Sequence, residues 1–392
     1  MSDAEDMDVP TAAEEEGEEV QDLSNSDVTT KYQEAAKIVN LALSGVVQQC
    51  VAGARLTELC KFGDTVITTR CAQIFQKKVK GVAVEKGIAF PTCISVNECV
   101  CNNSPLESEA EQQPPLADGD LVKIELGCHV AGYIAVAAHT VKVGAAPTAE
   151  APATGAEADV MLACYQAAQL AAAAMVPGAT NDQVAETVRK VATSYGVNIV
   201  TGTKMHQLKP YIINGSKTVV PRADEPKHEA ITFAANEVYA VNVLVTSGEG
   251  KPKEGAQATT IFKRAIDKKY KLKMNASRNL FNQISVRFPT LPFCLRAFDD
   301  ERQARLGVKE CVNHDLLEPF PVLYGHSGEV IAQAKFTVLL LPSGPSIVAG
   351  SLIDYEAYKS DKTLDEESAA ALQAAQEKAE AKKKKKTSKK KK

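Results

Sequence analysis

The chain has 392 residues, of which 45% are hydrophobic and 24% charged, and its formal net charge at pH 7 is -4. This length provides a core for one large α/β domain or for two smaller ones. No run of eighteen apolar residues occurs and the first residues are acidic, so we expect neither a membrane span nor a secretory signal.

Charge is strongly segregated along the chain. Residues 1–30 contain eleven acids and no Lys or Arg, whereas residues 378–392 contain ten lysines and one acid. Residues 263–309 carry twelve basic side chains against four acids, a balance of +8. An acidic protein with two basic segments is typical of a polyanion binder that works through those segments.

The predicted elements begin after an acidic extension, residues 1–26, which lacks aromatic residues and is expected to be disordered. Asp27 is placed to cap a helix with apolar residues at helical spacing as far as Val47. A second helix is predicted near Thr65 to Val79, and an extended loop follows at residues 87–92.

Residues Leu121 to Val141 form the predicted centre of the fold. Two runs rich in Val and Ile flank a Gly-containing turn at Val130-Ala131-Gly132, which is typical of a β-hairpin. Glu125 lies inside the first run, where a buried carboxylate is costly unless it is paired or bound to a metal. Eleven residues later the second run offers Val136 and no second acid.

Helices and short strands follow the hairpin. An Ala-rich helix is predicted from about Glu157 to Met175, and Thr180 with Gln183 forms a capping-box pattern that begins another helix. Strand-like runs are predicted at Val197–Thr201, Glu237–Val245, Thr259–Lys263 and Val330–Leu341. This order predicts an α/β fold with a mostly antiparallel, mixed sheet and helices on one face.

A basic insert is predicted at about residues 263–329. Ser277 begins a helix with an apolar stripe, and Asp299-Asp300-Glu301 begins a second helix with acids at the positive end of its dipole. Beyond the main domain we expect a partly helical extension over residues 346–381, and then a disordered lysine-rich tail over residues 382–392.

Ten cysteines occur without a secretory context that would oxidise them. The close pair Cys99 and Cys101 has no second pair at zinc-ribbon spacing. We therefore expect reduced thiols, either buried or half-exposed.

Several short motifs together resemble type 2 methionine aminopeptidases. They are Gly87–Thr92 (GIAFPT), Ser95–Asn97, Gly119-Asp120, Lys123–Gly127 (KIELG) and Glu237–Ala240 (EVYA). The resemblance covers about residues 28–345 and implies one domain over residues 27–345. It implies the pita-bread fold of creatinase and methionine aminopeptidase, in which two related α/β halves surround a dinuclear metal site and a helical insert precedes the last strand.

That family holds its two metals with two Asp on the hairpin, one His, and two Glu on late strands. The corresponding positions here are Glu125, Val136, His206, Asn242 and Lys335. A valine cannot ligate and an ammonium repels a divalent cation, so the resemblance implies a site without metals. The two auxiliary histidines of the family fall on Asn102 and Asn214.

A second set of motifs is more similar to the proliferation-associated, Erb-receptor-binding protein family, which are metal-free relatives of the aminopeptidase. It comprises Asn97–Cys101, Val238–Gly250, Leu295–Phe298, Gln333–Leu340 and the Lys-rich C-terminus. The resemblance implies a pseudoenzyme of the nucleus, nucleolus and cytoplasm. Such a protein binds RNA, pre-ribosomes and the large ribosomal subunit near the peptide exit, and acts in ribosome biogenesis, translation and growth regulation. We expect a monomer without a cofactor.

The candidate RNA contacts are basic residues of the insert and the tail, each of which releases counterions on meeting a phosphate. They are Lys263, Arg264, Lys268, Lys269, Lys271, Lys273 and Arg278 in the insert, and Lys382, Lys383, Lys384, Lys385 and Lys386 in the tail. The alternative is a solvated basic face without a partner. Tyr270, among these lysines, is either a base-stacking residue or part of the core.

Lys335 and Glu125 are predicted to point into the same former metal site, where the ammonium replaces the charge of the metals. The alternative is that Lys335 extends to solvent through the old substrate mouth. Two other functions stay open at this point. One is an active metallo-aminopeptidase with rearranged ligands, and the other is an interaction adaptor that uses the old cleft as a peptide groove.

Overall fold

The computed structural model describes residues 21–79, 81–226 and 229–390, without the side chains of residues 379–380 and 382–390. The predicted disorder of the N-terminal extension therefore falls largely outside the described residues. The α-helices within this part of the chain are α1 Ser26–Gln49, α2 Leu56–Gln73, α3 Gly155–Ala174, α4 Asn181–Ser194, α5 Asn275–Arg287, α6 Glu301–Asn313 and α7 Glu366–Lys390.

The strands vary in length from two to eleven residues. They are β1 Lys86–Val96, β2 Cys99–Cys101, β3 Leu121–Val130, β4 Tyr133–Lys142, β5 Asn198–Ile199, β6 Met205–Gln207, β7 Thr218–Val219, β8 Val238–Thr246, β9 Lys253–Glu254, β10 Ile261–Arg264, β11 Phe293–Cys294, β12 Leu317–Phe320, β13 Leu323–Tyr324, β14 Ile331–Leu341 and β15 Gly344–Ala349.

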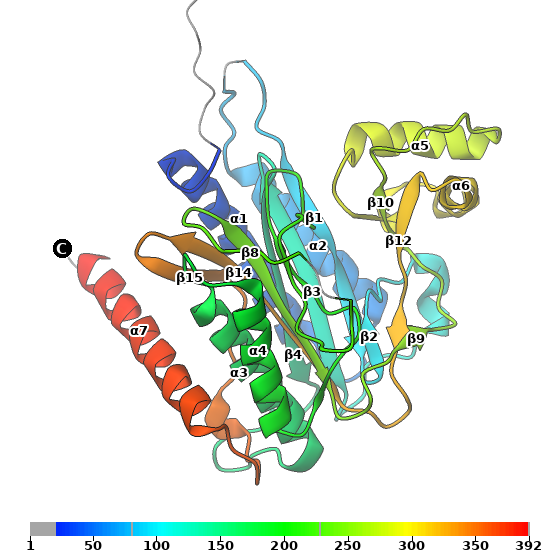
Figure 1. The fold of residues 1–392 in the computed structure, drawn as a ribbon. Helices are drawn as coiled ribbons and strands as arrows, with labels where there is room; N and C mark the ends of the chain where they lie inside the picture. The colour runs from blue at the N-terminus through cyan, green and yellow to red at the C-terminus, as the bar shows by residue number, and fades with distance from the viewer. Residues whose placement is uncertain (1–20, 80, 227–228, 391–392) are drawn as a thin grey trace, which may run out of the picture.

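One large sheet organises the molecule (Figure 1). Its order is β1-β3-β4-β14-β8-β6-β7, with β15 beside β14 and β5 beside β8. Each pairing between these strands is antiparallel, which differs from the predicted mixed sheet. The reason is the position of β14: β4 and β8 run in the same direction, but β14 lies between them and pairs antiparallel with both.

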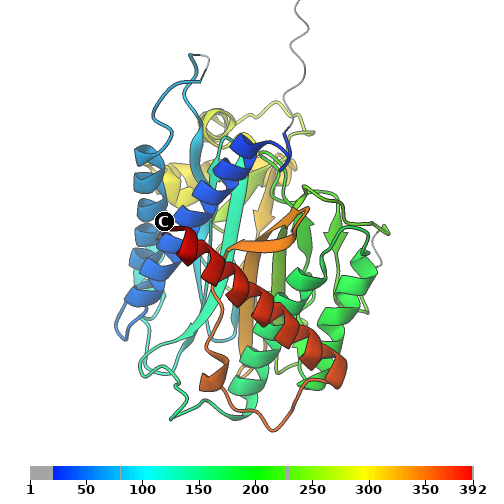
Figure 2. The ribbon, with the colours of Figure 1, turned by 90° about the vertical axis from the view of Figure 1, so that its left-hand side faces the viewer.

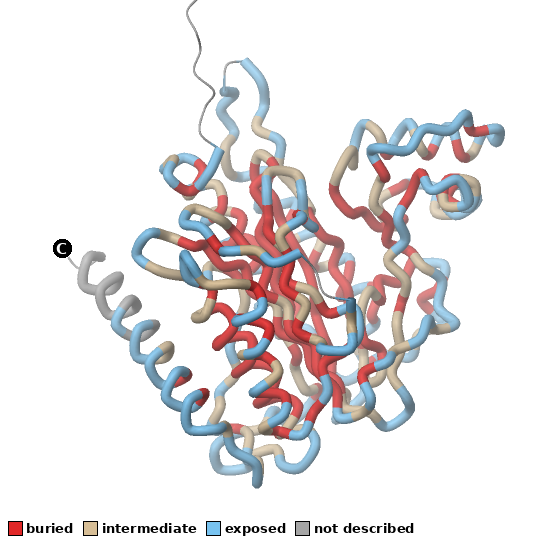
Figure 3. The backbone as a smooth tube through the Cα atoms, viewed as in Figure 1, coloured by how far each residue is buried: buried red, intermediate tan, exposed pale blue. Residues whose placement is uncertain are grey.

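The helices α1 to α4 cover one face of the sheet, as predicted (Figure 2). Alternation along each strand divides the side chains between the two faces. Ile124 and Leu126 of β3 pack with α1 and α2, and Ala334 and Phe336 of β14 pack with α3. The buried residues in Figure 3 accordingly concentrate in the sheet and in the inner sides of these helices. The opposite face is left for the insert.

The predicted hairpin is confirmed as β3 and β4, in register from Leu121 with Lys142 to Val130 with Tyr133. Its two turn residues, Ala131 and Gly132, have φ values of 51° and 80°. Two positive φ values are the signature of the type I′ turn, whose twist matches that of the strands it joins. A Cβ on Gly132 would lie 2.3 Å from Cδ2 of Tyr211, so only glycine fits there.

Several helix boundaries differ from their predicted positions, including that of α5, which begins at Asn275 and not at Ser277. The N-cap of α1 is Asn25, whose side chain accepts the amide N–H of Asp27, so Asp27 lies inside the helix. The second helix begins at Leu56 and ends at Gln73, earlier than predicted at both ends. Gly63 lies inside α2, although glycine is a poor helix former. At this residue the helix packs so closely on Thr92 of β1 that a side chain would not fit.

Later elements follow the sequence pattern more closely. The capping box of Thr180 and Gln183 at α4 is confirmed, and Asp300 caps α6 by accepting the amide N–H of Gln303. The strand β15 joins the sheet after the predicted domain end at residue 345. The helix α7 continues to Lys390 instead of ending before the lysine run, because the run contains no Gly or Pro and lysine is a good helix former. The last two residues of the predicted disordered tail lie outside the described residues.

All ten cysteines are free thiols, and all but Cys101 are buried, as predicted. Among the helices that the structure describes, none is long and apolar enough to cross a membrane.

We predict that Gly63→Ala destabilises the protein by roughly 1–3 kcal/mol, although alanine is the better helix former. An added Cβ would lie 2.5 Å from the hydroxyl oxygen of Thr92, which is buried on β1. Urea denaturation measures this change. The double variant Gly63→Ala/Thr92→Ala is the control, and it should recover most of the loss. Equal stability of Gly63→Ala and the parent would contradict the close packing.

Candidate functional site

The register of the central strands brings four polar side chains together on the face opposite the helices. Ala138 of β4 is paired with Glu125 of β3 on one side and with Lys335 of β14 on the other. Lys335 is in turn paired with Asn242 of β8. Directly paired residues point to the same face of a sheet. Gln333, two residues before Lys335 on β14, therefore points to that face as well.

The predicted ion pair between Lys335 and Glu125 is confirmed. The Lys335 ammonium donates to Oε1 of Glu125. The side-chain amide of Gln333 donates to Oε2 of the same carboxylate at 2.9 Å and to Oδ1 of Asn242 at 3.1 Å. Both oxygens of the buried carboxylate are thus satisfied without a metal. Lys335 also lies 5.8 Å from the ring centroid of Phe90 and is only half-buried.

The other two positions that correspond to ligands, Val136 and His206, lie on the same face of the sheet. Val136 packs in an apolar cluster with Phe90 and Ala240, and its backbone bonds the hydroxyl of Thr337. His206 is on β6, next to β8, with Nδ1 3.4 Å from the carbonyl oxygen of Gly215. The structure therefore links Glu125, Lys335 and Asn242 through direct bonds and through Gln333, and it places Val136 in an apolar cluster.

Burial controls the electrostatics around this carboxylate. The thiol of Cys93, paired with Glu125 across β1 and β3, has its pKa raised by burial and then by the negative charge of Glu125. Lys123, two residues before Glu125, is fully buried, and burial lowers its pKa to about 8. Its ammonium donates to the carbonyl oxygen of Asn97 and not to Glu125.

Sequence reasoning missed two polar residues here, Gln333 and Lys123. Strand alternation could have predicted that both face the site, because each lies two residues from a ligand-equivalent position on the same strand. Their hydrogen-bond partners come from other strands and depend on register, which the sequence pattern alone does not provide.

The residues present do not fit a pair of divalent metals. Such ions require several anionic or imidazole ligands, and bridging carboxylates between them. Here one carboxylate is already bound by an ammonium and an amide, and a valine occupies another ligand position. Across the described parts of the chain, no three His, Cys, Asp or Glu side chains are grouped so as to hold a metal.

Asn102 and Asn214, which correspond to the two auxiliary histidines of the aminopeptidases, both bond the insert. The amide of Asn102 donates to the carbonyl oxygen of Pro321 at 2.9 Å, and Oδ1 of Asn214 accepts from Lys263 at 3.2 Å. The ring of Phe320, at the end of β12, meets Phe90 edge-on at 5.8 Å. The return segment of the insert therefore contacts the residues that surround the former metal site.

The structure separates the candidate RNA contacts of the insert into two groups. Lys263 and Arg264 are half-buried on β10, where Lys263 pairs with Glu318 at 2.8 Å and Arg264 covers the ring of Phe281. Arg278 is exposed on α5 but bonds Leu272 and Asn275. The remaining four lysines lie on the loop that joins β10 to α5 and are exposed; they are Lys268, Lys269, Lys271 and Lys273.

The candidate contacts of the tail are far from the insert. The backbone of residues 382–386 belongs to α7, and their side chains lie outside the described part. The start of α7 is attached to the helical layer by Leu372 in the core and by a 2.7 Å ion pair between Glu367 and Lys190. Figures 1 and 2 place α7 over that layer and the insert on the other side of the sheet.

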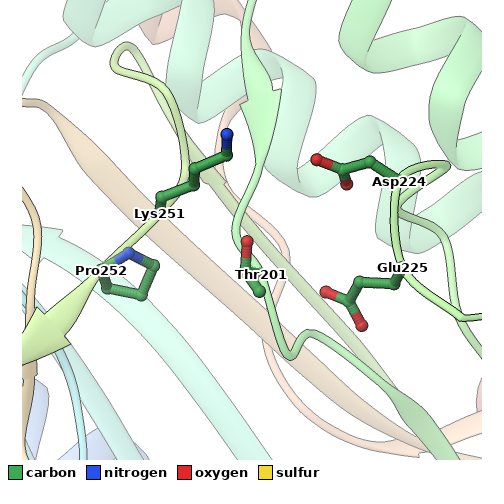
Figure 4. Close-up of a pocket in the computed structure, with 5 residues that line it drawn as sticks. All are labelled: Thr201, Asp224, Glu225, Lys251 and Pro252. Atoms are coloured by element: carbon green, nitrogen blue, oxygen red, sulfur yellow. The ribbon is translucent and has the colours of Figure 1, made fainter.

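Two hollows lie away from the former metal site. The larger, about 690 Å³, lies between α2, the start of β1 and the segment after α5, with Ile88 and Phe288 in its walls. The smaller, about 230 Å³, is lined by Thr201, Asp224 and Lys251, among others (Figure 4). Hydrogen bonds from Arg222 already occupy Asp224 and lower its pKa. Neither hollow has a former ligand position among its described lining residues.

Comparison with known proteins places this geometry in context. Residues 30–259 match the model of metallopeptidase family M24. The ERBB-3 binding protein 1 of Solanum tuberosum is 41% identical over 90% of this chain and 89% of its own length. The curved DNA-binding protein of Schizosaccharomyces pombe is 35% identical over 88% and 89%. The solved structure of a thermophilic Arx1 has a TM-score of 0.81 at 27% identity and covers 89% of this chain and 98% of its own.

We predict that Lys335→Met destabilises the protein by roughly 2 kcal/mol, because it leaves the Glu125 carboxylate buried without its cation. The double variant Glu125→Leu/Lys335→Met removes both charges and should recover at least half of that loss. Urea denaturation of the two single variants and the double variant gives the coupling between the residues.

The matched control is Lys190→Met, which breaks an exposed ion pair with Glu367. That change should cost less than about 0.5 kcal/mol, since exposed pairs contribute little. Equal effects of Lys335→Met and Lys190→Met would contradict a buried, charge-satisfying role for Lys335.

Proposed function

This chain belongs to metallopeptidase family M24, in the branch of the ERBB-3 binding and proliferation-associated proteins, and on that premise we propose that it is a non-catalytic, RNA-binding member. The predicted pita-bread fold is confirmed by the family match and by the similarity to the thermophilic Arx1. We propose further that its main partners are ribosomal RNA and the large ribosomal subunit near the peptide exit. It acts in ribosome biogenesis and translation, in the nucleus, nucleolus and cytoplasm.

One observation carries the proposal for RNA binding, namely the four exposed lysines on the β10–α5 loop. Lys268 lies 3.7 Å from Asp267, an exposed and therefore weak pair. The other three make no ion pair with the residues that the structure describes, so their charges are available to phosphates. The name of the Schizosaccharomyces pombe relative, curved DNA-binding protein, states that this relative binds another polyanion, which supports the proposal.

The proposal that the protein is not a peptidase rests on the chemistry of the former ligand positions. An ammonium occupies one of them and binds the surviving carboxylate, so it competes with any cation for the same oxygens. An active metallo-aminopeptidase with rearranged ligands would need new anionic ligands. An interaction adaptor with the old cleft as a peptide groove would not need the exposed lysines of the loop.

We predict that purified protein dialysed against Co²⁺, Mn²⁺ or Zn²⁺ retains less than one metal ion per chain and does not release methionine from a Met-initiated peptide. Elemental analysis and a peptide-cleavage assay measure the two quantities, with a methionine aminopeptidase as the positive control. Stoichiometric metal together with turnover would overturn the non-catalytic assignment and favour rearranged ligands.

We predict that the affinity for ribosomal RNA falls steeply with salt. Changing Lys268, Lys269, Lys271 and Lys273 to Gln should reduce the slope of log K against log salt by about three, because each neutralised phosphate contributes roughly 0.7–0.9. Filter binding and co-sedimentation with large ribosomal subunits at several salt concentrations test this.

The control for that experiment is a set of four exposed lysines outside the insert with the same change in charge. Changing Lys77, Lys78, Lys251 and Lys359 to Gln should leave the slope nearly unchanged. Equal losses in the two variants would indicate non-specific charge attraction instead of a site on the loop. An adaptor that uses the old cleft would keep its partners in both variants.

A further inference from the structure

The β10–α5 loop, residues 265–274, carries an aromatic stack among its lysines. The rings of Tyr270 and His314 lie face to face, with centroids 3.5 Å apart and an angle of 14° between their planes. Tyr270 keeps 38% of its surface exposed, and His314 is also exposed. Of the two interpretations left open by the sequence, Tyr270 is therefore at the surface and not in the core.

The loop is held in place without using the exposed lysine side chains. Leu272 is buried in the apolar cluster beneath the insert. The carboxylate of Glu310, on α6, accepts the amide N–H groups of Lys273 and Met274 at 2.7 and 3.1 Å. His314 directly follows α6, so the stack with Tyr270 makes a second connection between the loop and this helix. Such anchoring lowers the entropy lost on binding a partner.

The surroundings of the stack are both basic and apolar. Lys269 and Lys271 flank Tyr270 in the chain and are exposed. Two large apolar side chains of the same loop, Ile266 and Met274, are also exposed, at 66% and 45%. Basic groups interleaved with exposed aromatic and apolar groups are typical of surfaces that hold single-stranded nucleic acid, where bases stack on rings while cations follow the backbone.

We propose that the Tyr270–His314 stack is a stacking platform for an unpaired RNA base, with the flanking lysines on the adjacent phosphates. This inference rests on the RNA-binding function proposed above and specifies its substrate as a bulged, looped or single-stranded nucleotide. In a paired A-form helix the faces of the bases are covered by their neighbours, so an aromatic ring can reach only a base that has left the stack. A regular duplex would meet the lysines alone.

The test uses the full chain and two RNA hairpins that differ in one nucleotide. In the first hairpin a single 2-aminopurine is bulged from the stem, and in the second it is paired with uridine. The parent protein should bind the bulged hairpin more tightly and quench its 2-aminopurine fluorescence. Tyr270→Ala should weaken binding of the bulged hairpin about tenfold, which corresponds to about 1.4 kcal/mol, and leave the paired hairpin unchanged.

Two matched variants separate stacking from charge and from folding. Tyr270→Phe keeps the ring and should keep the preference for the bulged hairpin. Lys271→Gln should weaken both hairpins by the same factor, because it removes a phosphate contact. Circular dichroism and thermal unfolding of each variant check that the fold is retained, as expected for exposed positions.

The outcomes distinguish this inference from the function on which it rests. The platform proposal is wrong if the parent binds both hairpins with equal affinity, or if Tyr270→Ala weakens both equally. In either case the stack only supports the loop, and the RNA-binding function is unaffected. If the parent binds neither hairpin at any salt concentration, the proposed RNA-binding function is itself wrong and the platform falls with it.

Discussion

The fold depends on one charge-satisfying contact across the centre of its sheet. Glu125 on β3 is buried, and burying a carboxylate is costly unless it is paired and hydrogen-bonded. The ammonium of Lys335 and the amide of Gln333 supply these bonds from β14, two strands away. In a fold that surrounds metals in its relatives, the protein has thus placed a cation of its own at the carboxylate, so that the sheet keeps its polar centre.

That replacement has consequences for the rest of the open face. The helices cover the other face mainly through two apolar clusters, whereas the polar side chains around Glu125 lie on the side of the insert. There, Asn102 and Asn214 bond the insert directly, at Pro321 and Lys263. These two side chains thus help to hold the insert against the sheet. The exposed lysines and Tyr270 are found further out, on the β10–α5 loop.

Much of this organisation was predictable because it depends on local chemistry. The hairpin follows from two β-branched runs and a glycine turn, and the capping box of α4 follows from Thr180 and Gln183. The pairing of Lys335 with Glu125 was predictable only with the family resemblance, since the two residues are 210 positions apart. The predicted start of α2 was wrong, since Arg55 at its N-cap makes no side-chain capping bond that the sequence could signal. The antiparallel pairing throughout the large sheet likewise depends on the position of β14 between β4 and β8.

The sequence by itself determined the composition of the site, the basic character of the insert and the type of each main element. These properties belong to single residues or to short windows, in which periodicity and charge act locally. Only the tertiary structure decided which polar groups meet and which lysines stay accessible. Strand register is set by packing over the whole sheet. It brought Gln333 to Glu125, and the packing of the insert largely buried Lys263 and left Tyr270 at the surface. Long-range contacts, not residue type, distinguish a paired charge from an available one.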